Sequence, residues 1–195
     1  MPTSGAERLL EGLLAAGLVQ FGRFASTPGF DPLRLHLELL PSYPQVLAEA
    51  SRALEALTAD VAYDFVIAAP DALALATMLS QQRGLPLVYS RGRGETPTHD
   101  LAGAYDVGHP ALLVSLVHDD ERALDRLMRS AASVGLETVA AAAVIDLDSS
   151  AAVNQKPRLS VWTLRGLVDE LVGQGIIPPN QAATVREWLT RRRPG

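Results

Sequence analysis

The residues with the clearest chemical potential are three consecutive acids, Asp119-Asp120-Glu121, which directly follow His118. They lie where a predicted strand, Ala111 to Val117, meets a predicted helix. Ligands, anions above all, usually bind at such a turn because the strand end meets the positive N-terminus of the helix. The acids could hold a metal ion or transfer protons, but acids in a first helical turn also cap the helix and offset its dipole. We favour capping, predict no metal site, and keep His118, Asp119 and Asp120 as ligand-binding candidates.

Further candidates lie between Ser90 and Gly108, a segment with four glycines and no hydrophobic periodicity. Loops of this length inside compact domains are usually functional or mobile. Arg91 and Arg93 could contact a phosphate or a carboxylate through their planar donor forks, and His99 could donate a proton near neutral pH. We predict both arginines as ligand-binding candidates, with a solvated loop as the alternative, and His99 as the candidate catalytic residue.

The elements around these residues form two strand-helix-strand units. In the first, the buried strand Phe65 to Ala68 precedes a helix that ends at Gly84, and Leu87 to Tyr89 forms the next strand. In the second, the apolar run from Ala111 is followed by a helix with an apolar stripe and by the apolar run Val139 to Leu147. Continuous apolar runs of this length are typical of parallel strands that are buried on both faces. The pattern predicts an α/β fold with a mostly parallel central sheet.

The ends of the chain carry peripheral elements. A leucine-rich helix at residues 7–16 precedes two strands, 18–24 and 33–38, that we expect to form a hairpin outside the parallel sheet. Residues 148–157 read as a polar connection before a last strand at 159–162, and two helices follow. We expect a single domain, because 195 residues leave no length for a second full core.

The composition excludes several classes of function. The absence of cysteine rules out disulfides, thiolate catalysis and cysteine-ligated metals. A net charge of -5 argues against a nucleic-acid partner. No apolar run approaches the roughly 20 residues of a membrane span, and the first residues do not resemble a signal peptide. We therefore expect a cytoplasmic protein with no nucleic-acid or membrane partner.

Several ordered segments resemble orotate phosphoribosyltransferases of the type I phosphoribosyltransferase family. The matching segments, in chain order, are Gly22-Arg23-Phe24, Phe65 to Pro70, Gly84 to Arg91, Thr163-Leu164 and Gly175-Ile176-Ile177. The resemblance covers nearly the whole chain. It implies the type I fold, in which a central mostly parallel sheet is flanked by helices, while an N-terminal helix with its hairpin and the C-terminal helices form a small hood. On this basis residues 1–40 and 158–195 belong to the hood, and residues 41–157 form the α/β core.

The segments that bind phosphoribosyl diphosphate in the family are altered. The family's acidic pair at the strand end corresponds to Ser115 and Leu116, and its Thr/Gly phosphate loop corresponds to residues 119–123. We read Ser115 as a strand residue and not as a nucleophile. The pyrophosphate loop, residues 69–74, has no glycine, and the mobile loop keeps only His99 of the family's lysine and histidine. The changes at residues 69–74 and 119–123 and the loss of the lysine remove glycine or positive charge, and we expect side chains to occupy the ligand pocket.

The resemblance therefore implies a catalytically degenerate relative of orotate phosphoribosyltransferase, related to pyrimidine nucleotide biosynthesis, that acts as a binding, regulatory or partner subunit. We expect a homodimer without a cofactor, and an intact paralogue is a second possible partner. The alternative is an active phosphoribosyltransferase with a divergent site, which would use Arg91, Arg93 and His99. Mg²⁺ is expected only under this alternative.

Overall fold

The computed structural model describes residues 5–26, 29–92, 100–104, 106–147, 152–153 and 155–192. Its elements follow one another in the order α1 (Gly5–Ala15), β1 (Val19–Ser26), β2 (Gly29–Leu35), the 3-10 helix η1 (Leu37–Ser42), α2 (Pro44–Leu57), β3 (Phe65–Ala68), α3 (Leu73–Arg83), β4 (Leu87–Ser90), β5 (Leu101–Ala102), β6 (Pro110–His118), α5 (Glu121–Ser133), β7 (Glu137–Asp146), β8 (Ala152–Val153), β9 (Lys156–Thr163), α6 (Leu164–Gly173) and α7 (Pro179–Arg192).

A seven-stranded sheet in the order β5-β4-β3-β6-β7-β9-β8 forms the centre of the molecule. The five inner strands are parallel, and the two outermost strands are antiparallel to their neighbours. β6 occupies the middle, and its residues from Ala111 to Leu116 are all buried. Such a strand needs the continuous apolar sequence that predicted it, because both of its faces lie against other elements. The predicted α/β fold with a mostly parallel sheet is confirmed.

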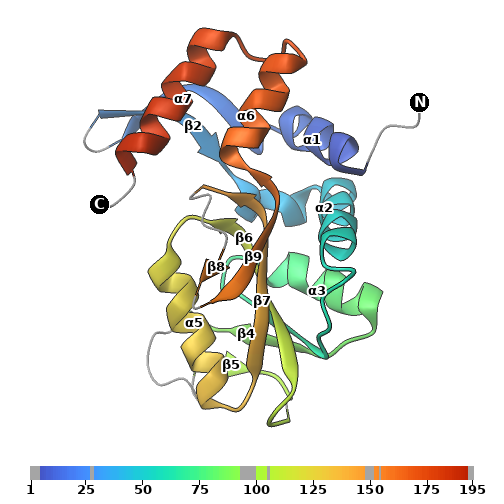
Figure 1. Ribbon diagram of the computed structural model, residues 1–195. Helices are drawn as coiled ribbons and strands as arrows, with labels where there is room; N and C mark the ends of the chain where they lie inside the picture. Colours follow the sequence, from blue (N-terminus) through green and yellow to red (C-terminus); the bar gives the residue numbers. More distant parts are fainter. Residues whose placement is uncertain are drawn as a thin grey trace.

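Helices cover both faces of this sheet, with α2 and α3 on one face and α5 on the other (Figure 1). The predicted apolar stripe of α5 is buried and consists of Leu124, Leu127, Met128 and Ala131. The C-terminal end of α3 is set by Gly84, whose positive φ of 65° is a left-handed conformation that glycine adopts without steric cost. Both strand-helix-strand units therefore form as the sequence indicated.

The peripheral elements α1, β1, β2, α6 and α7 gather at one end of the sheet (Figure 1), and we call this group the hood. β1 and β2 form the predicted antiparallel hairpin as a separate two-stranded sheet. The indole N–H of Trp188 on α7 donates a hydrogen bond to Asp31 Oδ1 on β2 at 2.8 Å. β9 pairs with β7, so residues up to Thr163 lie in the large sheet, although the expected boundary assigned the chain from residue 158 onward to the hood.

Three local features differ from the sequence-based expectation. β2 ends at Leu35, and the residues expected to complete its strand start η1, where Leu37 and Leu40 are buried together at the three-residue spacing of a 3-10 helix. Within the expected loop after Ser90, β5 pairs with β4. β9 begins at Lys156, inside the expected polar connection. Strands as short as β5 are too brief to produce a periodic pattern, so they escape sequence-based prediction.

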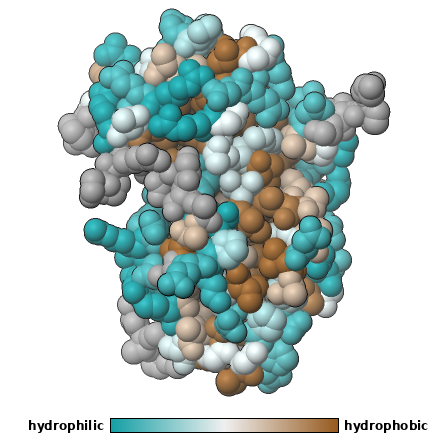
Figure 2. All heavy atoms as spheres, in the orientation of Figure 1, coloured by the Kyte–Doolittle hydropathy of each residue, from teal (hydrophilic) through white to brown (hydrophobic). Residues whose placement is uncertain are grey.

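Hydrophobic residues also reach the surface. Figure 2 shows them gathered over the region that α2 and α3 occupy in Figure 1. The partly buried hydrophobic residues of these two helices are Val46, Ala53, Leu57, Ala74 and Met78. Among the helices in the described part of the chain, none has the length and apolar character needed to cross a membrane.

Candidate functional site

A cavity of about 690 Å³ lies at the carboxyl ends of β3, β4 and β6. Its wall consists of the residues after β3, the end of β4, the end of β6 with the following turn, and one side of α5. This is the edge at which open α/β sheets bind their ligands. The cavity is therefore open, although we expected side chains to occupy the ligand pocket. Only the turn at the start of α5 is occupied, because the carboxylate of Asp120 caps its own helix.

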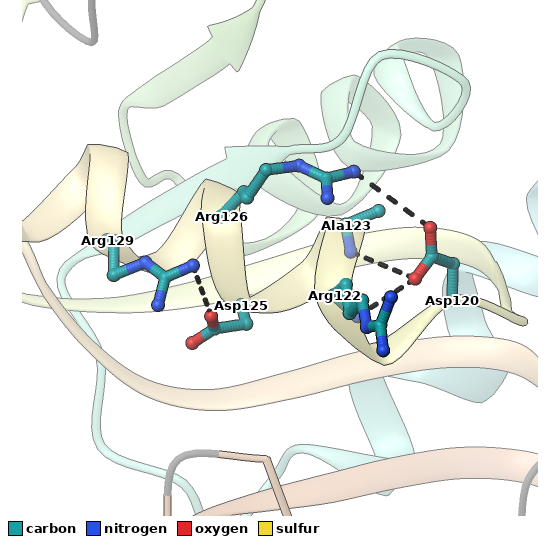
Figure 3. A network of polar contacts seen from close by, with 6 residues as sticks. All are labelled: Asp120, Arg122, Ala123, Asp125, Arg126 and Arg129. Atoms are coloured by element: carbon teal, nitrogen blue, oxygen red, sulfur yellow. Dashed lines mark hydrogen bonds and ion pairs between the residues drawn. The ribbon is translucent and has the colours of Figure 1, made fainter. Parts of the chain in front are cut away.

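That turn is organised by Asp120, the N-cap residue of α5 (Figure 3). Its Oδ1 accepts hydrogen bonds from the backbone N–H groups of Arg122 at 2.9 Å and of Ala123 at 3.2 Å. The first N–H groups of a helix have no partner within the helix, so a side-chain acceptor at this position satisfies them. The interpretation of this acid as a capping residue is confirmed.

Two arginines on the cavity side of α5 are paired with acids (Figure 3). Arg126 Nη2 lies 3.9 Å from Asp120 Oδ2, and Arg129 Nη2 lies 2.5 Å from Asp125 Oδ2. Both guanidinium groups are exposed, so their pairs are screened by solvent. The positive charge that lines the cavity is thus largely matched by carboxylates of the same helix and its cap.

His118 ends β6 and lies beside a buried ion pair. Its Nδ1 is 3.6 Å from Oδ2 of Asp146, its register partner at the end of β7, and Asp146 Oδ1 accepts a hydrogen bond of 2.6 Å from Arg158 Nη2. Only 3% of His118 is exposed, although it lines the cavity. Neither of its ring nitrogens has a hydrogen-bond partner within the described part of the chain. The structure therefore places this candidate in the cavity lining, with the carboxylate of Asp146 next to it.

Sequence reasoning missed Asp146 and Arg158. A signal existed for Asp146, because an acid near the end of an apolar strand such as Val139 to Leu147 is costly to bury without a partner. Arg158 gave no such signal, since it lay in a stretch read as polar connection and strand start. The 2.6 Å contact joins β7 to its neighbour β9, so it becomes visible only when the two strands are paired.

Asp71, after β3, lines the cavity and was not among the candidates from the sequence. Desolvation in the cleft raises the pKa of its carboxyl, although the side chain still reaches solvent. The backbone N–H groups of Asp71 and Leu116 oppose this shift, while the nearby charge of Asp119 adds to it. Asp119 itself is exposed at the cavity wall. The carboxylates of Asp71 and Asp119 thus follow the ends of two adjacent strands, β3 and β6, and both line the cavity.

The segment after β4 brings a hydroxyl and a further acid to the cavity. Ser90 Oγ donates to Asp100 Oδ2 at 2.5 Å and accepts from the backbone N–H of Gly92 at 3.1 Å. Arg91 donates its backbone N–H to Asp100 O, while its side chain is exposed and is not among the residues that line the cavity. The other two candidates of this segment, Arg93 and His99, lie outside the described residues.

The described cavity acids do not form a cluster of three. In the part of the chain that the structure describes, no three His, Asp or Glu side chains come close enough together to hold a metal ion. Carboxylates that stay apart can instead accept hydrogen bonds from separate hydroxyl or amino groups of a larger ligand. The arrangement can therefore bind a polar organic molecule.

No protein-family model matches this chain. Its structure is similar to that of Leishmania donovani UMP synthase, with a TM-score of 0.82, 23% identity and 94% of this chain covered, although the chain spans only 42% of that protein. It is also similar to orotate phosphoribosyltransferase from Francisella tularensis, with a TM-score of 0.71, 16% identity and coverage of 98% of this chain and 97% of the other. The enzyme of the same name from Aeropyrum pernix has a TM-score of 0.71 at 20% identity and covers 85% of this chain and 98% of its own. The chain thus has the type I phosphoribosyltransferase fold, and its resemblance to orotate phosphoribosyltransferases is confirmed at the level of the fold.

Proposed function

We propose that this protein is a catalytically degenerate relative of the orotate phosphoribosyltransferases, one that binds a small molecule as a regulatory or partner subunit and does not transfer a phosphoribosyl group. The observation that carries the proposal is the cap of α5. Asp120 already accepts the N–H groups of Arg122 and Ala123 that a phosphate at this turn would need.

Charge adds to this argument. A phosphate placed about 4 Å from either Asp119 or Asp120 would be disfavoured by about 1 to 4 kcal/mol per charge pair, from water-like to surface-like dielectric. The arginines that could offset this repulsion, Arg126 and Arg129, already lie beside acids. The strand end offers Ser115 and Leu116 where the family resemblance calls for two acids that hold the ribose hydroxyls.

An enzyme assay tests the proposal. The purified protein would be incubated with orotate, phosphoribosyl diphosphate and Mg²⁺, and orotidine monophosphate would be followed by absorbance, with the Francisella tularensis enzyme as a positive control. We expect no product, and calorimetry should detect no binding of phosphoribosyl diphosphate at millimolar concentration. Turnover on the order of 1 per second or faster would contradict the proposal and favour an active transferase that uses Arg91, Arg93 and His99.

We further propose that the protein forms a homodimer in the cytoplasm. Support comes from the hydrophobic residues at the surface of α2 and α3, since contiguous apolar surface is often covered by a partner. Light scattering after size-exclusion chromatography should then give twice the chain mass of 20.8 kDa. A monomer that becomes a heterodimer only when an intact paralogue is added would identify the paralogue as the partner instead.

A further inference from the structure

The charge of the cavity wall is predominantly negative. Four carboxylates line it, from Asp71, Asp100, Asp119 and Asp120, against the two guanidinium groups of α5 described above. Arg126 lies beside Asp120, one of these four acids, and Arg129 lies beside Asp125, so four acids face two guanidinium groups in the lining and the field inside the cavity is negative. A bound anion would be repelled, and a cation attracted.

A buried hydroxyl adds a second, independent feature that calls for a ligand. Ser115 lines the cavity and is only 5% exposed, and its Oγ has no hydrogen-bond partner in the part of the chain that the structure describes. Buried polar groups are almost always hydrogen-bonded, so a group of this kind at a cavity wall is suited to a ligand atom. The two ring nitrogens of His118, which also lines the cavity, likewise have no hydrogen-bond partner among the described residues.

Part of the remaining wall is apolar. Pro70 after β3, Val117 on β6, and Leu124 and Leu127 on α5 line the same cavity. A ligand that fills this space therefore gains from an apolar body in addition to its polar groups. The cavity volume of about 690 Å³ is within the range of small-molecule sites in proteins.

We propose that the cavity binds a small organic cation, an amine or amidine attached to an apolar body, with its positive group at Asp71 and Asp119 and a hydrogen bond to Ser115 Oγ. A metal ion is a poorer occupant, because the described acids do not form a cluster that could coordinate one. This inference rests on the proposed function, since a site that held a phosphate ligand would need the opposite charge.

Three probes of the same shape separate charge from size: benzamidine, which is a cation, benzamide, which is neutral, and benzoate, which is an anion. Their binding to the full chain would be measured by calorimetry and by ligand-observed NMR. We expect benzamidine to bind at least about tenfold more tightly than benzoate, with benzamide in between. The difference should shrink as salt is raised, because the cavity is open to solvent and salt screens its charges.

Variants locate the cation. Asp119→Asn and Asp71→Asn should each weaken benzamidine binding about threefold or more while leaving benzamide unchanged. Asp60→Asn removes an exposed acid outside the cavity and serves as the matched control that should change neither. Circular dichroism would show that each variant is folded.

The inference is overturned if benzamidine binds no more tightly than benzoate, or if it does not bind at millimolar concentration. It is also overturned if Asp60→Asn weakens benzamidine binding as much as Asp119→Asn does. The orotidine monophosphate assay distinguishes this failure from failure of the proposed function. A protein without turnover and without cation preference refutes only the ligand class, whereas turnover refutes the degenerate function itself.

Discussion

Replacing Asp120 with alanine should destabilise the protein by about 1 to 2 kcal/mol, the upper part of the range for loss of an N-cap. The structure supports the upper part because one carboxylate oxygen accepts two backbone N–H groups, at 2.9 and 3.2 Å. The negative charge at the helix start adds a few tenths to about 1 kcal/mol within that total. The ion pair with Arg126 adds little, since its atoms are 3.9 Å apart and 63% and 54% of the two side chains are exposed.

The matched control is Asp120→Asn, which keeps an oxygen acceptor for the same N–H groups and removes only the charge. We expect it to lose less than about 1 kcal/mol. For a chain of this size 1 kcal/mol corresponds to roughly 2 to 4 °C in Tm, so the alanine variant should melt about 2 to 8 °C below the wild type. Thermal and urea unfolding followed by circular dichroism would measure both variants at pH 7 and moderate salt.

Comparing the stability of the alanine and asparagine variants shows whether the two hydrogen bonds of the cap stabilise the protein. If alanine and asparagine lower the stability equally, the two hydrogen bonds contribute nothing and the effect is one of charge alone. If alanine matches the wild type, the helix start is satisfied by solvent. Either outcome would remove the main argument that an internal carboxylate has replaced a bound phosphate at this turn.

Three further predictions concern other parts of the molecule. Asp71→Asn should stabilise the protein at pH values above the raised pKa of this carboxyl, because the folded state disfavours its ionised form. The gain in stability should disappear as the pH falls below the ordinary pKa of 3.8, and urea unfolding from pH 7 to 3.5 would measure this. Gly103→Ala should lower the free energy of unfolding by about 1 to 3 kcal/mol, since the residue has a φ of +141° and a Cβ would lie 2.7 Å from the carbonyl oxygen of Leu87. The control Gly173→Ala, where a Cβ would meet open space, should be neutral or stabilising in the same melting experiment. Asp146→Ala should cost about 3 to 5 kcal/mol by leaving the buried Arg158 guanidinium without this carboxylate, and a change below 1 kcal/mol would show that the pair is dispensable.

Much of the fold follows from local patterns. The stripe of α5, the left-handed Gly84 and the continuous apolar run of β6 each reflect a rule that acts over a few neighbouring residues, so the sequence alone predicts these elements. The cap at Asp120 belongs to the same class, since its hydrogen bonds reach only two and three residues along the chain.

The cavity could be predicted only in part. Its position at the turn after β6 follows from the strand-helix-strand order, but its content depends on contacts between distant segments. The contact of Asp146 with Arg158 requires the adjacency of β7 and β9, and the influence of Asp119 on Asp71 requires the adjacency of β3 and β6. Neither contact between these distant residues produces a periodic pattern in the sequence.

The two edges of the large sheet are occupied by its shortest strands. β5 at one edge and β8 at the other each contribute two residues in the described part of the chain, and each runs antiparallel to its neighbour. Long flat edges offer unpaired N–H and C=O groups to strands of other chains, which leads to aggregation. These short edge strands leave little backbone for strand addition. A strand of another chain could therefore form few backbone hydrogen bonds with β5 or β8 themselves.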